Sequence, residues 1–377
     1  MARDIRRLVI LGGSATGLAV ARSAHALGLA VTIADTRRSL ATYSRCAAFH
    51  PLPSEASELA FEELMTLAGD VPTALIADSD SWLRFLQGWR EELDEEFTVL
   101  HAPRPVIATC LDKERFSLWC ERNQVPAPRY IPMTDGEFSR ADRFPVIVRP
   151  RLTCHHRTHD VPKAIECRNA AELQKAIELF RGINVDPHVS ESLLRPGTRC
   201  FSVGLARRPD GRMMSLTAER VRPLPEQCAA GTFVRLTPQP LVQELAESVA
   251  EKLDLDGIAE VEIVSNRDAT ELSVIEVNAR PWLQFPLADR SGHALLAFLL
   301  GRSVHASRPR QTDGIRWIDT TADRYICFSR HRGLVWDGKV RALDWFRAAF
   351  AAETHPVWSW RDPGPLLHSL MKAWMPR

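Results

Sequence analysis

Residues 257–282 read GIAEVEIVSNRDATELSVIEVNARPW, and this stretch predicts a β-hairpin, because two runs rich in Val and Ile flank a polar turn. Side chains two residues apart on a strand point to the same face, so Glu276 and Asn278 project together, and the paired strand can bring Glu262 beside them. Two carboxylates and an amide oxygen suit Mg²⁺, which prefers oxygen ligands and completes its shell with water and phosphate. Arg280 continues the same face and can bind a phosphate oxygen. On the hairpin alone, a solvent-facing acidic strand with an ordinary salt bridge to Arg280 is an open alternative.

The N-terminal stretch, residues 7–38, reads RLVILGGSATGLAVARSAHALGLAVTIADTRR. It predicts a strand, a glycine turn, a helix and a second strand that ends at Asp35. Three glycines, Gly12, Gly13 and Gly17, let the start of the helix lie close to the first strand. Their spacing is not GxGxxG, so a tight structural turn and a weak dinucleotide site both remain open.

A further strand at residues 73–80 and an amphipathic helix at 81–93, with Ser81 as its N-cap, continue this pattern. Alternating strands and helices predict a mostly parallel sheet that is covered on both faces. The elements expected further along the chain are a helix closed by Pro126 and Pro128, a strand at 144–150, a helix at 168–180, antiparallel strands within 188–222 and a helix at 242–255.

Composition argues against nucleic-acid binding and a membrane span, and it predicts the compartment of the protein. The 377 residues include 48 Lys and Arg against 47 Asp and Glu, so no overall field attracts nucleic acid or anionic lipid. The longest apolar run, residues 294–300, is far shorter than the roughly 20 residues that span a bilayer. The eight cysteines contain no CxxC pair, so we expect a cytoplasmic protein with reduced thiols. A homodimer is the default oligomeric state.

Five motifs in a fixed order connect the hairpin to a known family: DKERF (112–116), FPVIVRP (144–150), VSESLLRPG (189–197), VEI (261–263) and IEVNAR (275–280). In this order the chain resembles the ATP-grasp superfamily, and in particular the predicted carboxylate-amine ligases of bacterial biosynthetic and polysaccharide gene clusters. Four further stretches are similar to that group: SRCAAFHPLP, ADSDSWLRFL, ERVRPLP and WSWRDPGPLL.

The resemblance implies a fold that combines α/β and α+β units. It implies a Rossmann-like pre-ATP-grasp domain at 1–103, a two-lobed ATP-grasp domain at 104–310 and a C-terminal extension at 311–377. Within the ATP-grasp domain, a small lid lobe would span about 113–190 and a larger lobe about 191–310. The implied activity is an ADP-forming ligation of a small-molecule carboxylate and an amine, with ATP and Mg²⁺, or alternatively Mn²⁺, as cofactors.

The resemblance also implies roles for individual residues. Lys113, Arg149 and Lys163 would reach the ATP phosphates, and the hinge segment Ser190, Glu191, Ser192 and Leu193 would lie along the adenine, with Glu191 near the ribose or the adenine. Glu262, Glu276 and Asn278 would hold the metal, and Arg280 the transferred phosphate. Arg220 and Arg222, which alternate on one strand, would face the acceptor pocket; a solvated basic edge is the alternative.

Two features depart from the superfamily pattern. Position 149 is normally lysine, and Arg149 keeps the charge with a different reach. The loop after it, RPRLTCHHRTHD, contains no glycine to wrap phosphates with backbone N–H groups. Its Cys154, His155, His156 and His159 could bind zinc, but they have no partner pair elsewhere, so we expect a basic lid.

Two other functions stay open on the sequence. The N-terminal βαβ unit and Asp35 fit an NAD(P)-dependent oxidoreductase, although this leaves the acidic hairpin without a role. Arg149 and the glycine-free loop fit a nucleotide-binding module without catalysis.

Overall fold

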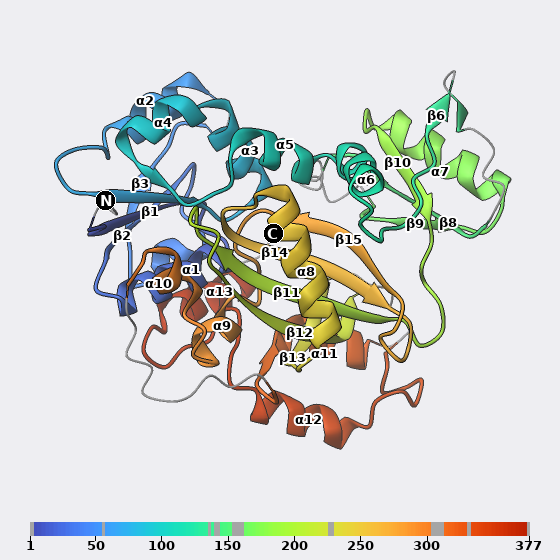
Figure 1. The fold of residues 1–377 in the computed structure, drawn as a ribbon. Helices are drawn as coiled ribbons and strands as arrows, with labels where there is room; N and C mark the ends of the chain where they lie inside the picture. The colour runs from blue at the N-terminus through green and yellow to red at the C-terminus, as the bar shows by residue number, and fades with distance from the viewer. Residues whose placement is uncertain are drawn as a thin grey trace.

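The computed structural model describes residues 4–54, 57–134, 137–138, 144–152, 162–224, 230–302, 313–329 and 333–374 (Figure 1). Its N-terminal part is a five-stranded sheet in the order β3-β2-β1-β4-β5, and every neighbouring pair is parallel, as predicted. The strands are β1 (Arg7–Leu11), β2 (Ala30–Asp35), β3 (Ala48–Pro51), β4 (Thr73–Ala77) and β5 (Thr98–Val99). The helices are α1 (Ala15–Ala26), η1 (Leu40–Tyr43), α2 (Glu58–Met65), α3 (Asp80–Gly88) and α4 (Arg90–Glu96).

Helices cover both faces of this sheet, because its central strands are apolar on both sides. Leu8 and Ile10 of β1 pack in one buried cluster with Leu18 of α1, while Val9 packs in another with Trp82 of α3. The helix expected at 81–93 differs from the prediction: it begins at Asp80, after Ser79 at the N-cap position, and divides at Trp89 into α3 and α4.

A small lobe follows. It contains a three-stranded sheet in the order β10-β8-β9, made of β8 (Val146–Pro150), β9 (Ile165–Cys167) and β10 (Pro187–Glu191). Helix α7 (Ala170–Gly182) packs on it through Phe180. The lobe also contains β6 (Met133–Thr134) and β7 (Glu137–Phe138), and α5 (Arg104–Leu111) and α6 (Lys113–Arg122) lead into it.

The largest sheet has six strands in the order β15-β14-β11-β12-β13-β16, all antiparallel. The strands are β11 (Arg199–Arg207), β12 (Met213–Leu224), β13 (Ala230–Leu236), β14 (Gly257–Ser265), β15 (Leu272–Asn278) and β16 (Arg316–Ile318). Helix α8 (Pro240–Leu253) crosses one face, and α9 (Pro286–Arg290) and α10 (Leu295–Leu299) pack in the cluster on the other face. The predicted hairpin is β14 and β15, which pair directly.

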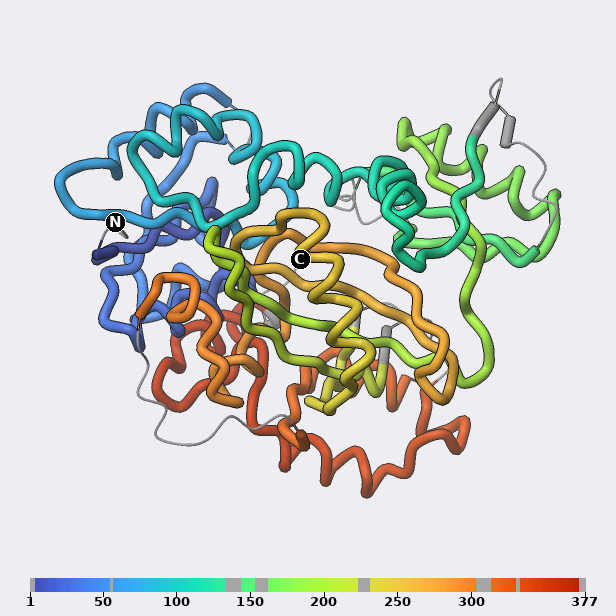
Figure 2. Tube along the Cα trace, in the orientation of Figure 1, coloured from blue at the N-terminus to red at the C-terminus, as the bar shows by residue number. Residues whose placement is uncertain are grey.

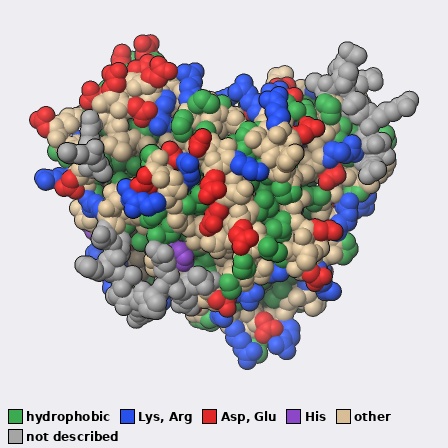
Figure 3. All heavy atoms as spheres, viewed as in Figure 1, with side chains coloured by type: hydrophobic (Ala, Val, Ile, Leu, Met, Phe, Trp, Pro, Cys, Tyr) green, Lys and Arg blue, Asp and Glu red, His purple; other side chains and the backbone are tan. Residues whose placement is uncertain are grey.

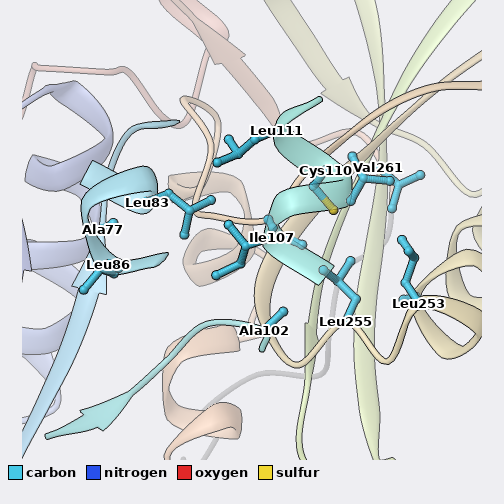
Figure 4. Close-up of a cluster of buried hydrophobic side chains, with 14 of the residues drawn as sticks. Ala77, Leu83, Leu86, Ala102, Ile107, Cys110, Leu111, Leu253, Leu255 and Val261 are labelled. Carbon is cyan, nitrogen blue, oxygen red and sulfur yellow. The ribbon is translucent and has the colours of Figure 1, made fainter. Parts of the chain in front are cut away.

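Helix α5 joins the N-terminal sheet to the largest sheet through one apolar core. Ile107 and Cys110 of α5 lie between Leu83 of α3 and Val261 of β14 (Figure 4). This shared core fixes the edge of the N-terminal sheet against the hairpin, and the candidate site lies there.

The C-terminal segment contains β16, α11 (Thr320–Phe328), α12 (Ala342–Ala351) and α13 (Gly364–Trp374). It returns to the N-terminal domain through Asp362, whose buried carboxylate accepts hydrogen bonds from Arg22 at 2.9 Å and from the Ser44 hydroxyl at 2.7 Å. The rings of Tyr43 and His368 stack with centroids 3.7 Å apart. The segment predicted as an extension therefore completes the large sheet and packs on the N-terminal domain.

The structure bears on two expectations drawn from composition, the absence of a membrane-spanning helix and the presence of reduced cysteine thiols. In the described part of the chain, no helix combines the length and the apolarity needed to cross a bilayer. The expectation of reduced thiols throughout is wrong, because Cys200 is disulfide-bonded. The thiols of Cys46, Cys110, Cys120, Cys167 and Cys327 are free.

Candidate active site

A cavity of about 590 Å³ lies between the large sheet, the small lobe and the N-terminal domain. It brings together eleven of the thirteen residues predicted from the sequence, from segments up to 167 positions apart. These are Lys113, Arg149, Lys163, Ser190, Glu191, Leu193, Arg220, Glu262, Glu276, Asn278 and Arg280. Ser192 and Arg222 do not line it.

The hairpin places four polar side chains at one end of the cavity. Glu262 on β14 pairs with Glu276 on β15, and Glu260 pairs with Asn278. The Asn278 amide Nδ2 donates to Glu260 Oε2 at 3.0 Å and to Glu262 Oε1 at 3.1 Å. Glu260 was missed from the sequence, although it lies two residues before Glu262 and therefore shares its face.

Arg220 on β12 closes this group. Its guanidinium donates to Glu262 Oε2 at 2.8 Å, to Glu260 Oε1 at 3.1 Å and to the Ser202 hydroxyl at 2.9 Å. Burial alone would lower the pKa of Arg220, but the two carboxylates outweigh burial and raise it. Burial and the neighbouring charge of Glu262 raise the pKa of Glu260. The site is therefore a compact network of compensated charges.

Lys113 and Arg149 face this network from the side of the small lobe. Lys113 follows the N-cap Asp112 at the start of α6, and its buried Nζ donates to Glu276 Oε1 at 3.1 Å. Arg149 is on β8, and its buried Nε has no hydrogen-bond partner among the described residues. Burial lowers its pKa, and Glu276 and Glu262 partly offset this effect. A buried guanidinium N–H without an acceptor fits a phosphate oxygen.

The hinge segment lies on β10 and just after it. The Ser190 hydroxyl is buried and likewise unpartnered within the described residues. The backbone N–H groups of Glu191 and Ser192 donate to Arg129 and Pro145 carbonyls at 2.9 and 3.0 Å, so they are already used inside the protein. The Ser192 hydroxyl donates to Glu166, which lines the cavity although Ser192 does not. Leu193 and Leu194 supply an apolar wall for a base.

Arg280 is held by the N-terminal domain. Its guanidinium donates to both carboxylate oxygens of Asp80, at 2.6 and 3.1 Å, and Asp80 is the first residue of α3. Burial opposes the charge on Arg280, but Asp80 outweighs burial and raises its pKa. Asp80 lies within the ADSDSWLRFL stretch, but nothing in its local pattern pointed to Arg280.

Arg222 has a different surrounding from the one expected. The pairing of β12 with β13 shifts register between Arg220 and Arg222, and such a bulge breaks the alternation of the side chains. Arg222 forms a two-pronged ion pair with the fully buried Asp323 of α11, at 2.8 and 2.7 Å. The two arginines therefore do not share the cavity.

The N-terminal glycine turn is filled by the protein's own carboxylates. The Gly13 N–H donates to Asp35 Oδ2 at 2.9 Å, and the Ser14 N–H donates to Asp78 Oδ2 at 2.8 Å. A Cβ atom on Gly12 would lie 1.9 Å from Asp78 Oδ1. Because these amides and Asp35 are already engaged, the geometry favours the tight structural turn over a dinucleotide site.

The donors at the hairpin fit a hard divalent cation by chemical type, because they are carboxylate and amide oxygens. Arg220, Asn278 and Lys113 contact these carboxylates in the structure. No group of three or more His, Cys, Asp or Glu side chains among the described residues is already arranged around a metal position. The zinc alternative at Cys154, His155, His156 and His159 lies outside the described residues.

The sequence matches no protein-family model and no curated protein. Solved structures do match. An ADP complex of N5-carboxyaminoimidazole ribonucleotide synthetase has a TM-score of 0.65 at 14% identity, over 82% of this chain and 79% of that one. The ADP complex of the Staphylococcus aureus N5-carboxyaminoimidazole synthetase has a TM-score of 0.62 at 15% identity, over 79% and 78%.

An L-amino acid ligase from Bacillus licheniformis has a TM-score of 0.57 at 17% identity, over 73% of this chain and 67% of that one. At these identities the similarity is one of fold, and it covers about four-fifths of this chain, 79% and 82% in the two synthetase matches. The chain therefore has the ATP-grasp fold that its five ordered motifs predict.

Proposed function

We propose that this protein is an ATP-dependent carboxylate-amine ligase that forms an amide through an acyl phosphate and releases ADP and phosphate. The observation that carries the proposal is the meeting of the acidic hairpin with Lys113 and Arg149 across one cavity. Two of the solved neighbours are ADP complexes and a third is an L-amino acid ligase, which supports nucleotide use by this chain. We also propose a cytoplasmic location, which the five free thiols among the described residues favour and the disulfide at Cys200 does not.

In this proposal the chain binds ATP between its two lobes. Lys113, Arg149 and Lys163 contact the phosphates, and the segment from Ser190 to Leu193 lies along the adenine. Glu262, Glu276 and Asn278 would hold Mg²⁺, or Mn²⁺, with Glu260 as a further carboxylate beside them. The metal supplies positive charge that neutralises the phosphate oxygens. A metal held there would share Glu262 with Arg220, which donates to Glu262 Oε2 at 2.8 Å.

The chemistry then has two steps. A carboxylate oxygen of the substrate attacks the γ-phosphorus, and the bond to the leaving oxygen of ADP breaks. In this proposal Arg280, which donates to Asp80, would neutralise charge on the transferred group. The amine nitrogen then attacks the acyl carbon, loses a proton, and phosphate leaves. Closure of the small lobe over the cavity would exclude water, which would otherwise hydrolyse the acyl phosphate.

A nucleotide-binding module without catalysis is the second candidate, because Arg149 replaces the usual lysine. The two candidates differ in one measurement. We expect ADP and phosphate to be released in equal amounts when Mg-ATP is supplied with an acid and an amine from a panel of amino acids, dicarboxylates, ammonia and polyamines. Thermal stabilisation by ATP without release over the whole panel would favour the module instead. A fall in NAD(P)H absorbance would favour the oxidoreductase.

A further inference from the structure

A second cavity, of about 640 Å³, lies beside the start of β11, where the chain enters the large sheet from the small lobe. Figure 2 shows the connection from β10 to β11 running from that lobe to the large sheet. Residues 194–200 line the cavity on one side, and residues of β12, β13 and the C-terminal segment complete the lining. Leu194 and Arg220 also line the candidate active site, so the two cavities are neighbours.

The lining of this second cavity is strongly basic. Its charged side chains among the described residues are one carboxylate, Glu219, and six cations: Arg195, Arg199, Arg220, Arg222, Arg235 and Lys339. The whole chain carries 48 basic against 47 acidic side chains, and the two kinds are interspersed over most of the face drawn in Figure 3. The positive charge is therefore a local concentration, and we call the site the basic cavity.

Two of the six cations are compensated by carboxylates that lie outside this lining. Arg220 donates to Glu260 and Glu262 in the active-site network, and Arg222 forms its two-pronged ion pair with Asp323. The charge of the basic cavity therefore comes from the other four cations, set against Glu219.

Three arginines of the basic cavity keep most of their hydrogen-bond donors. Arg199 Nε donates to Glu219 Oε1 at 2.8 Å, and Arg235 Nη2 lies 3.5 Å from Glu219 Oε2. Arg195, an exposed residue, donates from Nη1 to a backbone carbonyl, and no carboxylate among the described residues forms an ion pair with it. Each guanidinium has five N–H donors, and these contacts use one of them on each arginine. The remaining donors are available to a ligand.

The sheet and one aromatic ring hold two of these guanidinium groups in place. Arg199 is on β11 and Arg235 is on β13, on either side of the β12 strand that carries Glu219. Neighbouring strands are about 4.8 Å apart, so the two arginines come from strands roughly 10 Å apart. The Arg199 guanidinium also lies over the Phe201 ring, 4.9 Å from its centroid. Two positioned cations on separate strands suit a ligand with more than one anionic group.

We propose that the basic cavity is a second ligand site, and that it binds a small molecule with two or more carboxylate or phosphate groups. The planar fork of arginine matches the oxygens of both groups in two-pronged hydrogen bonds. Glu219 keeps the arginines in position, and the ligand adds the negative charge that one carboxylate does not supply. The proposal does not depend on the ligase activity, because the arginines that carry it lie outside the active-site cavity.

An anionic polymer fits the basic cavity less well than a small molecule does. Its volume of about 640 Å³ is in the usual range of small-molecule sites, about 300–1,000 Å³. A nucleic acid is attracted by a field that extends over a surface, and this chain has almost no net charge.

Calorimetry of the full chain without added metal ions tests the proposal with two probes, tricarballylate and pyrophosphate. We expect at least one probe to bind, and the tighter one identifies carboxylate or phosphate as the preferred group. Arg195→Gln and Arg235→Gln should each raise its Kd at least about tenfold, because each removes a charge-assisted contact. Arg168→Gln is the matched control: it removes the same charge from an exposed site on the small lobe, outside both cavities, and should leave the Kd unchanged.

A change of opposite sign guards against effects of misfolding. Glu219→Gln removes the one acid from the described lining and keeps its shape, so the folded variant should bind the same probe several-fold more tightly. Failure of both probes to bind the wild-type chain would overturn the proposal, even if an oligoglutamate peptide did bind. So would unchanged Kd values in Arg195→Gln and Arg235→Gln, which would place the anion in the active-site cavity, or weaker binding by folded Glu219→Gln.

Discussion

Replacing Glu276 by Gln tests the metal site without requiring a known substrate. The Glu276 carboxylate is one-fifth exposed, accepts from Lys113 Nζ at 3.1 Å and lies opposite Glu262 on the paired strand. Glutamine keeps the shape and a hydrogen-bond acceptor, and it removes one negative charge. The substitution therefore separates the charge on this side chain from its packing.

The contacts of Glu276 set the expected losses of stability and of nucleotide affinity in Glu276→Gln. At an effective dielectric constant of about 20, two unit charges 3.1 Å apart attract by roughly 5 kcal/mol before desolvation is counted. Exposed pairs retain less than about 1 kcal/mol of this, and breaking fully buried pairs costs about 3–5 kcal/mol. Because Glu276 is partly exposed, we expect the free energy of unfolding to fall by about 1–2 kcal/mol. Loss of a metal ligand should weaken metal-dependent nucleotide binding by at least about 100-fold, or roughly 2.7 kcal/mol.

Calorimetric titration with ADP, in excess Mg²⁺ and separately in EDTA, measures the part of the ADP affinity that depends on the metal. We expect the wild-type chain to bind ADP more tightly with Mg²⁺, and Glu276→Gln to lose that gain while keeping its affinity in EDTA. Glu271→Gln, an exposed change on the same hairpin, is the control and should behave as wild type. A full Mg²⁺ effect in Glu276→Gln would refute the metal assignment.

Four further substitutions test other parts of the account. Arg149→Ala should raise the Kd for ADP at least about tenfold in calorimetry without lowering stability, because its buried Nε has no described partner to lose. Gly12→Ala should destabilise the fold by more than about 2 kcal/mol in chemical denaturation, since φ is +98° and the new Cβ would lie 1.9 Å from Asp78 Oδ1. Gly28→Ala, with φ of +75° and open space, should cost only about 1 kcal/mol. Burial lowers the pKa of His101 from 6.5 to about 3, so the unfolded chain binds a proton that the folded chain does not, and stability falls as pH drops from about 6.5 toward 3. His101→Gln should reduce that slope by up to about 1.4 kcal/mol per pH unit in denaturation at several pH values.

Local pattern predicted most of the elements and the hairpin part of the candidate site, whereas Lys113, Arg149, Lys163 and the hinge segment were implied by the family resemblance. The alternation of side chains on a strand predicted that Glu262, Glu276 and Asn278 share a face, and they do. The same rule extends to Glu260. It failed at Arg222, because a bulge in β12 is an irregularity that residue types do not reveal.

Contacts between distant segments were not predictable from local pattern. Arg22 and Asp362 are 340 positions apart, and Asp80 meets Arg280 across 200 positions. Such pairs depend on how whole domains pack, and the periodicity of a segment carries no information about that packing. In the C-terminal stretch only WSWRDPGPLL resembled the family, and nothing in its local pattern predicted that Asp362 would contact the N-terminal domain.

Trapping of the acyl phosphate tests the central claim most directly. The chain is incubated with Mg-ATP, hydroxylamine as the amine, and each member of a carboxylate panel, with Glu276→Gln as the blank. The account predicts that at least one acid yields hydroxamate and ADP in equal amounts, and that the blank yields neither. Release of AMP in place of ADP, or the absence of both products from a chain that binds ATP, would contradict it.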